Sequence, residues 1–187
     1  MTLLRTERLL LRPLEPADAE AYLAMRYHPE VVKWLPAEPG APMDNVRFTI
    51  DRFGQFWRER GYAPWGIFLE DRLIGHGGLN FLTVFSATEV MWALHPDFWG
   101  QGYATEMGKA ALEFGFGTLR LPLIFAITKP DNLASQAVMK RLGLRYTKNV
   151  VYKGKDAVWF ETVNPRASSA QPDGSPDRLP PAPSRRS

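Results

Sequence analysis

The sequence LHPDFWGQGYAT, residues 94–105, joins the end of a strand to the start of a helix through a turn with two glycines. Backbone N–H groups in the first turn of a helix have no carbonyl partner, and together with the positive end of the helix dipole they bind anions such as phosphate. Glycine lets a ligand approach the backbone closely. The pattern is neither a Walker A loop nor a G-x-G-x-x-G dinucleotide fingerprint. Taken alone, it predicts either a phosphate site or an ordinary structural turn.

Hydrophobic periodicity on both sides of this turn predicts a mixed sheet covered by helices, in a single α/β or α+β domain. The expected strands are Arg8–Pro13, Ala63–Glu70, Arg72–Phe81, Ala87–His95, Leu121–Thr128, Leu144–Tyr152 and Ala157–Val163. The expected helices are Pro16–Tyr27, Asn45–Arg60, a helix from the glycine turn to about Leu119, and Asp131–Leu142. Residues 31–42 (VVKWLPAEPGAP) are expected to form a proline-rich loop.

Composition limits the classes of function. The 187 residues are 45% apolar and 23% charged, which is typical of one globular domain. No apolar run approaches the roughly 18 residues that cross a bilayer, and the N-terminus does not resemble a signal peptide. We therefore expect a cytoplasmic protein with no membrane partner. The absence of cysteine excludes disulfides, thiolate metal sites and a cysteine nucleophile.

The pI of about 9.3 reflects the end of the chain more than its body. Residues 164–187 are rich in Pro and Ser and hold four Arg against two Asp, so they contribute +2 of the formal net charge of +3. Such a composition predicts a disordered tail after a domain formed by residues 1–163. That domain is nearly neutral and has no Lys/Arg cluster interleaved with aromatics, so we expect no nucleic-acid partner.

Two motifs together indicate a family. The glycine turn FWGQGYATEM resembles the pyrophosphate-binding motif Q/R-x-x-G-x-G/A of the GNAT N-acetyltransferases, with Trp99 at the Gln/Arg position, Gly102 on the glycine and Ala104 on the last small residue. The segment TKPDNLASQAVMKRLGLRY, residues 128–146, resembles the second element of the RimJ/RimL-like branch. The opening TERLLLRPLEPADAEAY is a third, weaker match. The resemblance covers residues 5–162 and implies a mostly antiparallel sheet of about seven strands.

The resemblance implies acetyl transfer from acetyl-CoA to a primary amine by direct attack on the thioester, with no metal. A carboxylate near the amine would keep it unprotonated, and Glu89 is the candidate base. Its alternative is a solvated charge at a strand end. Ser135 is the candidate acid, because Met139 occupies the position where many members carry a tyrosine and a thioether cannot donate a proton. The alternative is an ordinary serine in the first turn of a helix.

The resemblance also implies a set of cofactor contacts. Asn132 is expected to contact the pantetheine arm, to cap its helix, or both. Leu94 and His95 would act through their backbone at the end of a strand that splays from its neighbour. His76 and His95 are more readily explained as structural histidines than as bases, and Trp34, Phe81 and Trp92 are possible walls of the acceptor pocket. The expected cofactor-binding residues are Leu94, His95, Gln101, Gly102, Tyr103, Ala104, Thr105 and Asn132.

The partner is expected to be an amine, either the N-terminus of a ribosomal or other protein or a small molecule, bound by a monomer or homodimer. The sequence does not decide between these acceptors. The rival hypothesis is a non-catalytic acyl-CoA-binding sensor or interaction module. Met139 in place of the usual acid favours that rival.

Overall fold

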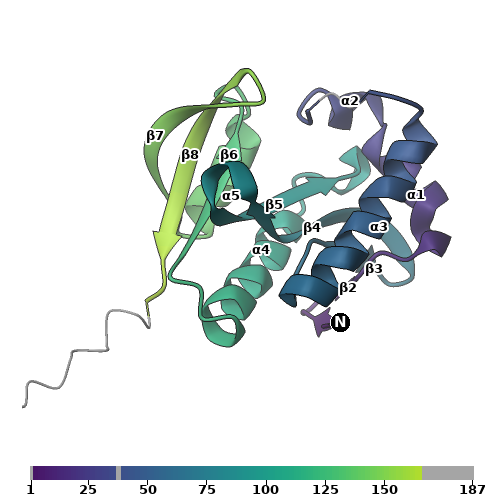
Figure 1. Cartoon of the computed structure of the whole chain (residues 1–187), viewed down its shortest axis with the longest axis horizontal. Helices are drawn as coiled ribbons and strands as arrows, with labels where there is room; N and C mark the ends of the chain where they lie inside the picture. Colours follow the sequence, from purple (N-terminus) through teal and green to yellow (C-terminus); the bar gives the residue numbers. More distant parts are fainter. Residues whose placement is uncertain (1, 37–38, 166–187) are drawn as a thin grey trace, which may run out of the picture.

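The computed structural model describes residues 2–36 and 39–165, and within them eight strands form one sheet in the order β1-β2-β3-β4-β5-β6-β8-β7 (Figure 1). Neighbouring strands are antiparallel except β5 and β6, which are parallel. The strands are β1 Leu4–Arg5, β2 Leu9–Arg12, β3 Trp65–Leu69, β4 Arg72–Leu82, β5 Ala87–Leu94, β6 Leu123–Thr128, β7 Arg145–Tyr152 and β8 Lys155–Val163.

Helices cover both faces of the sheet. They are α1 Ala19–Arg26, α2 Pro29–Val32, α3 Pro42–Arg60, α4 Tyr103–Glu113 and α5 Leu133–Arg141. Alternation along β4 separates the two faces, because successive side chains point to opposite sides. The His76 ring packs against Tyr22 of α1 and Phe53 of α3, whereas a Cβ at Gly77 would meet Met107 of α4. No helix in the described parts of the chain has the length and apolarity of a membrane span.

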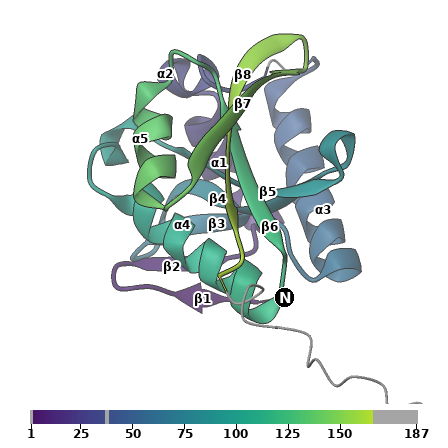
Figure 2. The ribbon, with the colours of Figure 1, turned by 90° about the vertical axis from the view of Figure 1, so that its left-hand side faces the viewer.

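The sheet opens between its two halves. Strands β5 and β6 share a single register pair, Glu89 with Phe125, although β5 continues along β4 as far as Leu94 and β6 continues along β8 as far as Thr128. Figure 2 shows the two strands running apart from this point. Beyond the pair, each strand therefore leaves one backbone edge without a strand partner, and the gap between these edges is where the functional site lies.

The predicted fold class is confirmed, with one strand more than the seven expected. Strand β1 has only two residues, too few for a period-2 pattern to be recognised, and it is defined by its pairing with β2. Helix α2 begins at Pro29 and takes up the first two residues of the expected proline-rich loop. The helix expected to run to about Leu119 ends at Glu113 and passes into a π-helical turn, Phe114–Thr118.

Asn164, the first residue of the predicted tail, packs against the domain. Asn164 is buried, and its Nδ2 donates to the backbone oxygens of Phe116 (3.2 Å) and Leu121 (3.0 Å). The side chain therefore ties the end of β8 to the turn between α4 and β6. The prediction of a disordered tail covers residues 164–187, and all of these except 164 and 165 lie outside the described residues.

Candidate active site

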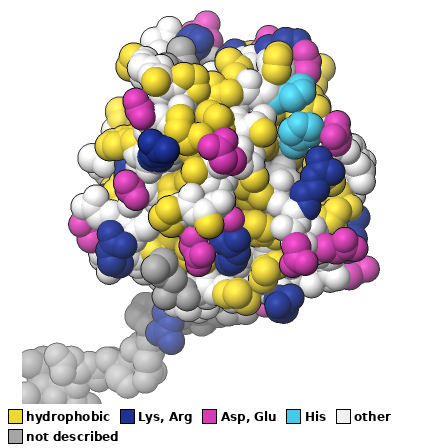
Figure 3. All heavy atoms as spheres, turned by 90° about the vertical axis from the view of Figure 1, so that its right-hand side faces the viewer, with side chains coloured by type: hydrophobic (Ala, Val, Ile, Leu, Met, Phe, Trp, Pro, Cys, Tyr) yellow, Lys and Arg dark blue, Asp and Glu magenta, His cyan; other side chains and the backbone are white. Residues whose placement is uncertain are grey.

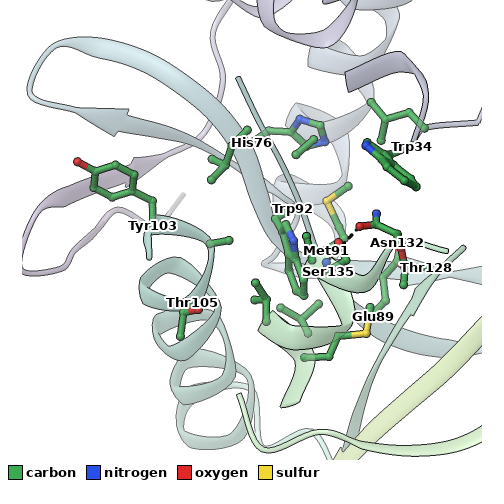
Figure 4. A pocket seen from close by; sticks show the side chains of 18 of the residues that line it. Trp34, His76, Glu89, Met91, Trp92, Tyr103, Thr105, Thr128, Asn132 and Ser135 are labelled. Carbon is green, nitrogen blue, oxygen red and sulfur yellow. Dashed lines mark hydrogen bonds between the residues drawn. The ribbon is translucent and has the colours of Figure 1, made fainter. Parts of the chain in front are cut away.

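A cleft of about 1410 Å³ occupies the gap between β5 and β6. Its walls come from α4 and α5 at one end and from α1, α3 and the β7–β8 turn at the other (Figure 4). Nine of the ten residues predicted to be catalytic or cofactor-binding line it, namely Glu89, Leu94, Gln101, Gly102, Tyr103, Ala104, Thr105, Asn132 and Ser135. Residues separated in the sequence by up to 46 positions thus face one space.

The glycine turn at one end of the cleft has the geometry of an anion cradle. Gly100 and Gly102 adopt φ values of 74° and 85°, a left-handed conformation that side chains disfavour. Gly102 caps α4, and the first bond of the helix runs from the Glu106 N–H to the Gly102 carbonyl. The N–H groups of residues 103–105 therefore precede any intrahelical acceptor and point out of the helix end.

Arg8, near the start of the chain, holds this turn in place. Its guanidinium donates to the Gln101 carbonyl (3.1 Å), forms an ion pair with Glu106 (2.7 Å), and lies 4.4 Å from the centre of the Tyr103 ring. In Figure 4 the Tyr103 ring accordingly points away from the other labelled side chains. Tyr103 thus contributes to the cleft through its backbone more than through its ring. Sequence reasoning missed Arg8, because nothing local links it to a turn more than ninety residues away.

The edge of β5 that faces the gap belongs to Trp92 and Leu94. The His95 N–H donates to the Ile74 carbonyl (2.8 Å) and so points toward β4. Because backbone groups alternate along a strand, those of Trp92 and Leu94 point the opposite way, into the gap. The indole Nε1 of Trp99 donates to the Leu94 carbonyl (2.7 Å), which leaves the Leu94 N–H and both groups of Trp92 facing the cleft.

His95 needs a correction. It is absent from the cleft lining, its N–H is engaged with β4, and its Nδ1 accepts from the Asp97 N–H (3.4 Å) at the start of the turn Pro96–Phe98. A histidine used in this way stabilises the turn and has no free group at the cleft. The backbone groups that β5 presents to the cleft are thus those of Trp92 and Leu94, and not those of His95.

Glu89 is a buried carboxylate, which contradicts the alternative of a solvated charge. It sits at the junction of β5 and β6, and its Oε1 accepts from Nδ2 of its cross-strand partner Asn80 (2.8 Å). Burial raises the pKa of Glu89 to about 7, against the hydrogen bond from Asn80 and the positive charge of Lys153, which both lower it. A carboxyl group that titrates near neutral pH is matched to general-base work.

Helix α5 brings two more polar groups to the cleft. The side-chain oxygen of Asn132 accepts from the Ser135 N–H (3.1 Å), so Asn132 is the N-cap of this helix, as predicted (dashed in Figure 4). The Ser135 hydroxyl and the Asn132 Nδ2 make no hydrogen bond with any described residue. Met139, one turn further along the helix, is buried and also lines the cleft. Ser135 is therefore the hydroxyl that α5 offers to a ligand.

The other end of the cleft is largely aromatic. Burial and the positive charge of Arg26 lower the pKa of His76 to about 3, so this imidazole is neutral, and its ring packs against Tyr22 and Phe53. Trp34 lines the cleft, with Lys129 Nζ 5.8 Å from its ring centre. Phe81 does not line it and lies instead under Arg60.

An open sheet split at two parallel strands, with an anion cradle and a buried carboxylate in the same cleft, is the arrangement expected of an acyl-CoA-dependent N-acyltransferase. Residues 8–145 match the family described as Acetyltransferase (GNAT) domain. The chain is 31% identical to the uncharacterized N-acetyltransferase YnaD of Bacillus subtilis (strain 168), over 83% of this chain and 91% of YnaD.

Solved structures agree with this match. The acetyltransferase of Agrobacterium tumefaciens superposes with a TM-score of 0.76 at 28% identity, over 87% of this chain and 94% of that one. RimL, a ribosomal L7/L12 alpha-N-protein acetyltransferase solved in complex with coenzyme A, has the same fold, with a TM-score of 0.72 at 18% identity over 87% and 98% of the two chains. The chain belongs to the GNAT family of N-acetyltransferases. Among the described residues, no cluster of His, Asp or Glu has the geometry of a metal site.

Proposed function

We propose that the protein transfers an acetyl group from acetyl-CoA to a primary amine, with Glu89 as the general base. The observation that carries this proposal is a buried carboxylate of pKa about 7 on the floor of the cleft whose other end is the glycine cradle. Burying a carboxylate is costly unless it is compensated, and Asn80 supplies only one neutral donor. The position is therefore better suited to proton transfer than to stability.

The residues of the cleft fit the cofactor. The unpaired N–H groups of residues 103–105, opened by the left-handed Gly102, match a pyrophosphate. The free backbone groups of Trp92 and Leu94 and the amide of Asn132 match the amide-bearing pantetheine arm. Acetyl-CoA supplies the thioester whose carbonyl carbon the amine attacks, with release of the thiol.

Glu89 accepts the proton that the amine loses, and Ser135, which lines the same cleft, donates a proton to the departing sulfur. The new bond joins the amine nitrogen to the acetyl carbon, and the bond to sulfur breaks. Solvent then takes the proton from Glu89 and restores the proton of Ser135. A thiolate is a fairly good leaving group, because the pKa of its thiol is near 8.5, so a weak proton donor suffices. The reaction therefore does not require the tyrosine that many family members carry at the position of Met139.

The rival is a module that binds acyl-CoA without catalysis, which Met139 favours. The test is thiol release from acetyl-CoA with a mixed panel of primary amines, run beside the thermal stability of the protein with acetyl-CoA. We expect stabilisation by acetyl-CoA and amine-dependent thiol release, both lost in Gly102→Glu, which adds a carboxylate at the cradle. Stabilisation without turnover on any amine would support the rival. No stabilisation by acetyl-CoA would contradict both.

The acceptor is a protein N-terminus or a small amine. RimL and the S5-alanine acetyltransferase of Vibrio fischeri are named for ribosomal-protein acceptors, and both share this fold at under 25% identity. All the proposed site residues come from one copy of the chain, so the site is complete in a monomer. The same holds for each copy in a homodimer.

A further inference from the structure

The acceptor end of the cleft, which we define as the lining contributed by α1, α3, β4, β5 and the β7–β8 hairpin, carries an excess of positive charge. Its cations on α3 and the β7–β8 hairpin are Arg52, Lys153 and Lys155. Its carboxylates are Glu89 and Asp156. Glu89 is the proposed base and has to be available to the amine. The balance of fixed charge that an acceptor meets is therefore positive.

Two of these cations, Arg52 of α3 and Lys153 of the β7–β8 turn, line the same end of the cleft as Glu89. The charge of Lys153, in the β7–β8 turn, lowers the pKa of Glu89. Burial and the charge of Glu89 raise the pKa of Tyr152, and Arg52 of α3 lowers it. Glu89, Arg52, Tyr152 and Lys153 all line the cleft, and these mutual effects agree with a shared location at its acceptor end. An amine that approaches Glu89 therefore enters a region lined by both Arg52 and Lys153.

Within the described parts of the chain, neither Arg52 nor Lys153 forms an ion pair. Both lie near aromatic rings instead: Arg52 is 6.0 Å from the centre of the Phe53 ring, and Lys153 is 5.5 Å from that of Tyr152. Like charges repel, so this end of the cleft disfavours an acceptor with several ammonium groups.

The positive charge is local. On the face that lies to the right of Figure 1, formed largely by α1, α2 and α3, Lys/Arg and Asp/Glu side chains are interspersed (Figure 3). The cations of the acceptor end therefore do not continue over that face as a broad basic surface of the kind that binds nucleic acid. Their partner is expected to be an anionic group that enters the cleft.

We propose that the acceptor is a primary amine that carries an acidic group close to the reacting nitrogen, with Arg52 and Lys153 binding that group while Glu89 takes the proton. This inference rests on the proposed acetyl transfer. Two sources share the chemistry, namely a free amino acid, through its α-carboxylate, and a peptide N-terminus followed by acidic residues. The same argument disfavours polyamines and polycationic aminoglycosides.

The test compares kcat/KM for matched amines by thiol release. One pair is phenylalanine and 2-phenylethylamine, which differ by a carboxylate. The other is a serine-initiated tetrapeptide with two glutamates and the same peptide with two lysines. Each ratio of acidic to non-acidic acceptor is measured in the wild type and in Arg52→Glu, Arg52→Lys and Arg47→Glu. Because the ratio is compared between variants, differences in the basicity of the amines cancel.

In the pair whose acidic member the wild type prefers, we expect Arg52→Glu to lower the ratio of acidic to non-acidic kcat/KM by about tenfold or more. The change should come mainly through KM, since a charge-assisted contact is worth about 1.5–3 kcal/mol. Arg52→Lys should keep most of the ratio. Arg47→Glu, an equal charge change on an exposed residue of α3 that does not line the cleft, should keep all of it. The pair that responds identifies the source of the acidic group.

Two results would overturn the inference and leave acetyl transfer standing. In the first, both members of a pair are acetylated and Arg52→Glu leaves the ratio of their kcat/KM values unchanged. In the second, the wild type prefers the lysine peptide and 2-phenylethylamine, and Arg52→Glu does not alter that preference. Absence of turnover on every amine, with stabilisation by acetyl-CoA intact, would overturn the proposed function and the inference with it.

Discussion

Replacing the proposed base should cost activity and increase stability at neutral and alkaline pH. Burial raises the pKa of Glu89 from 4.5 to about 7, so folding favours its protonated form. The sign follows from proton binding. Between these two values the folded state holds a proton that the unfolded state has lost, so the free energy of unfolding falls as pH rises. The contribution of Glu89 is most favourable below about pH 4.5 and is lost as pH rises through about 7.

Glu89→Gln removes the titrating carboxyl group. It keeps the shape of the side chain and an oxygen that accepts the hydrogen bond from Asn80. A shift of this size corresponds to about 3 kcal/mol, at 1.36 kcal/mol for each unit of pKa. The difference in unfolding free energy between variant and wild type should therefore increase by about 3 kcal/mol between pH 4 and pH 8. Other titrating groups, His76 included, are common to both proteins and cancel in this difference.

Urea denaturation at a series of pH values measures the difference directly, with Glu20→Gln, at an exposed carboxylate, as the control for charge removal. Thiol release measures activity on the same samples. A general base contributes about 10²–10⁴-fold, so the turnover of Glu89→Gln should fall most near neutral pH and recover as solvent deprotonates the amine. A stability difference that stays flat from pH 4 to pH 8 would refute a buried carboxyl of raised pKa. Full activity across pH 6–9 would refute the role as base.

Three further results are expected. Lys153→Gln removes a charge that lowers the pKa of Glu89, so the rise of kcat/KM with pH should move to higher pH, and a movement to lower pH would contradict the assignment. Ser135→Ala should lose rate without rescue at high pH while acetyl-CoA still raises the melting temperature; rescue of its rate at high pH would count against Ser135 as the donor. Gly102→Glu should abolish that stabilisation, which for a native-state ligand reaches about 2.7 kcal/mol at 100 times the dissociation constant, and an unchanged shift would place the cofactor elsewhere.

The elements that sequence reasoning recovered are those with a local cause. Strand β5, the glycine turn and helix α4 are adjacent in the chain, and each follows from periodicity, from glycine conformation or from helix-end chemistry. The cap of α5 by Asn132 is equally local, because its partner is the Ser135 N–H three residues away. Strand β1 was missed since two residues carry no period, and its existence depends on pairing with β2.

The parts of the site that were missed are held by contacts between distant segments. Asn80 becomes the partner of Glu89 only through the register of β4 with β5, and Arg8 reaches the glycine turn across the sheet. His95 was placed in the site because it ends a strand, but the direction of its N–H depends on which neighbour the strand pairs with at that residue. A single sequence holds no record of such a register.

The position of Lys153 links the base to the choice of acceptor. Its charge lowers the pKa of Glu89, which keeps a larger fraction of this carboxylate ionised near neutral pH but also makes it a weaker base. An acidic group bound at Lys153 would offset that charge while the acceptor is in place. The pKa of Glu89 would then rise toward that of the amine, which improves proton transfer in the complex with an acidic acceptor more than with a neutral one. On this argument the preference for acidic amines should appear in kcat as well as in KM, and Lys153→Gln should abolish the kcat part of the preference for the same pair of amines.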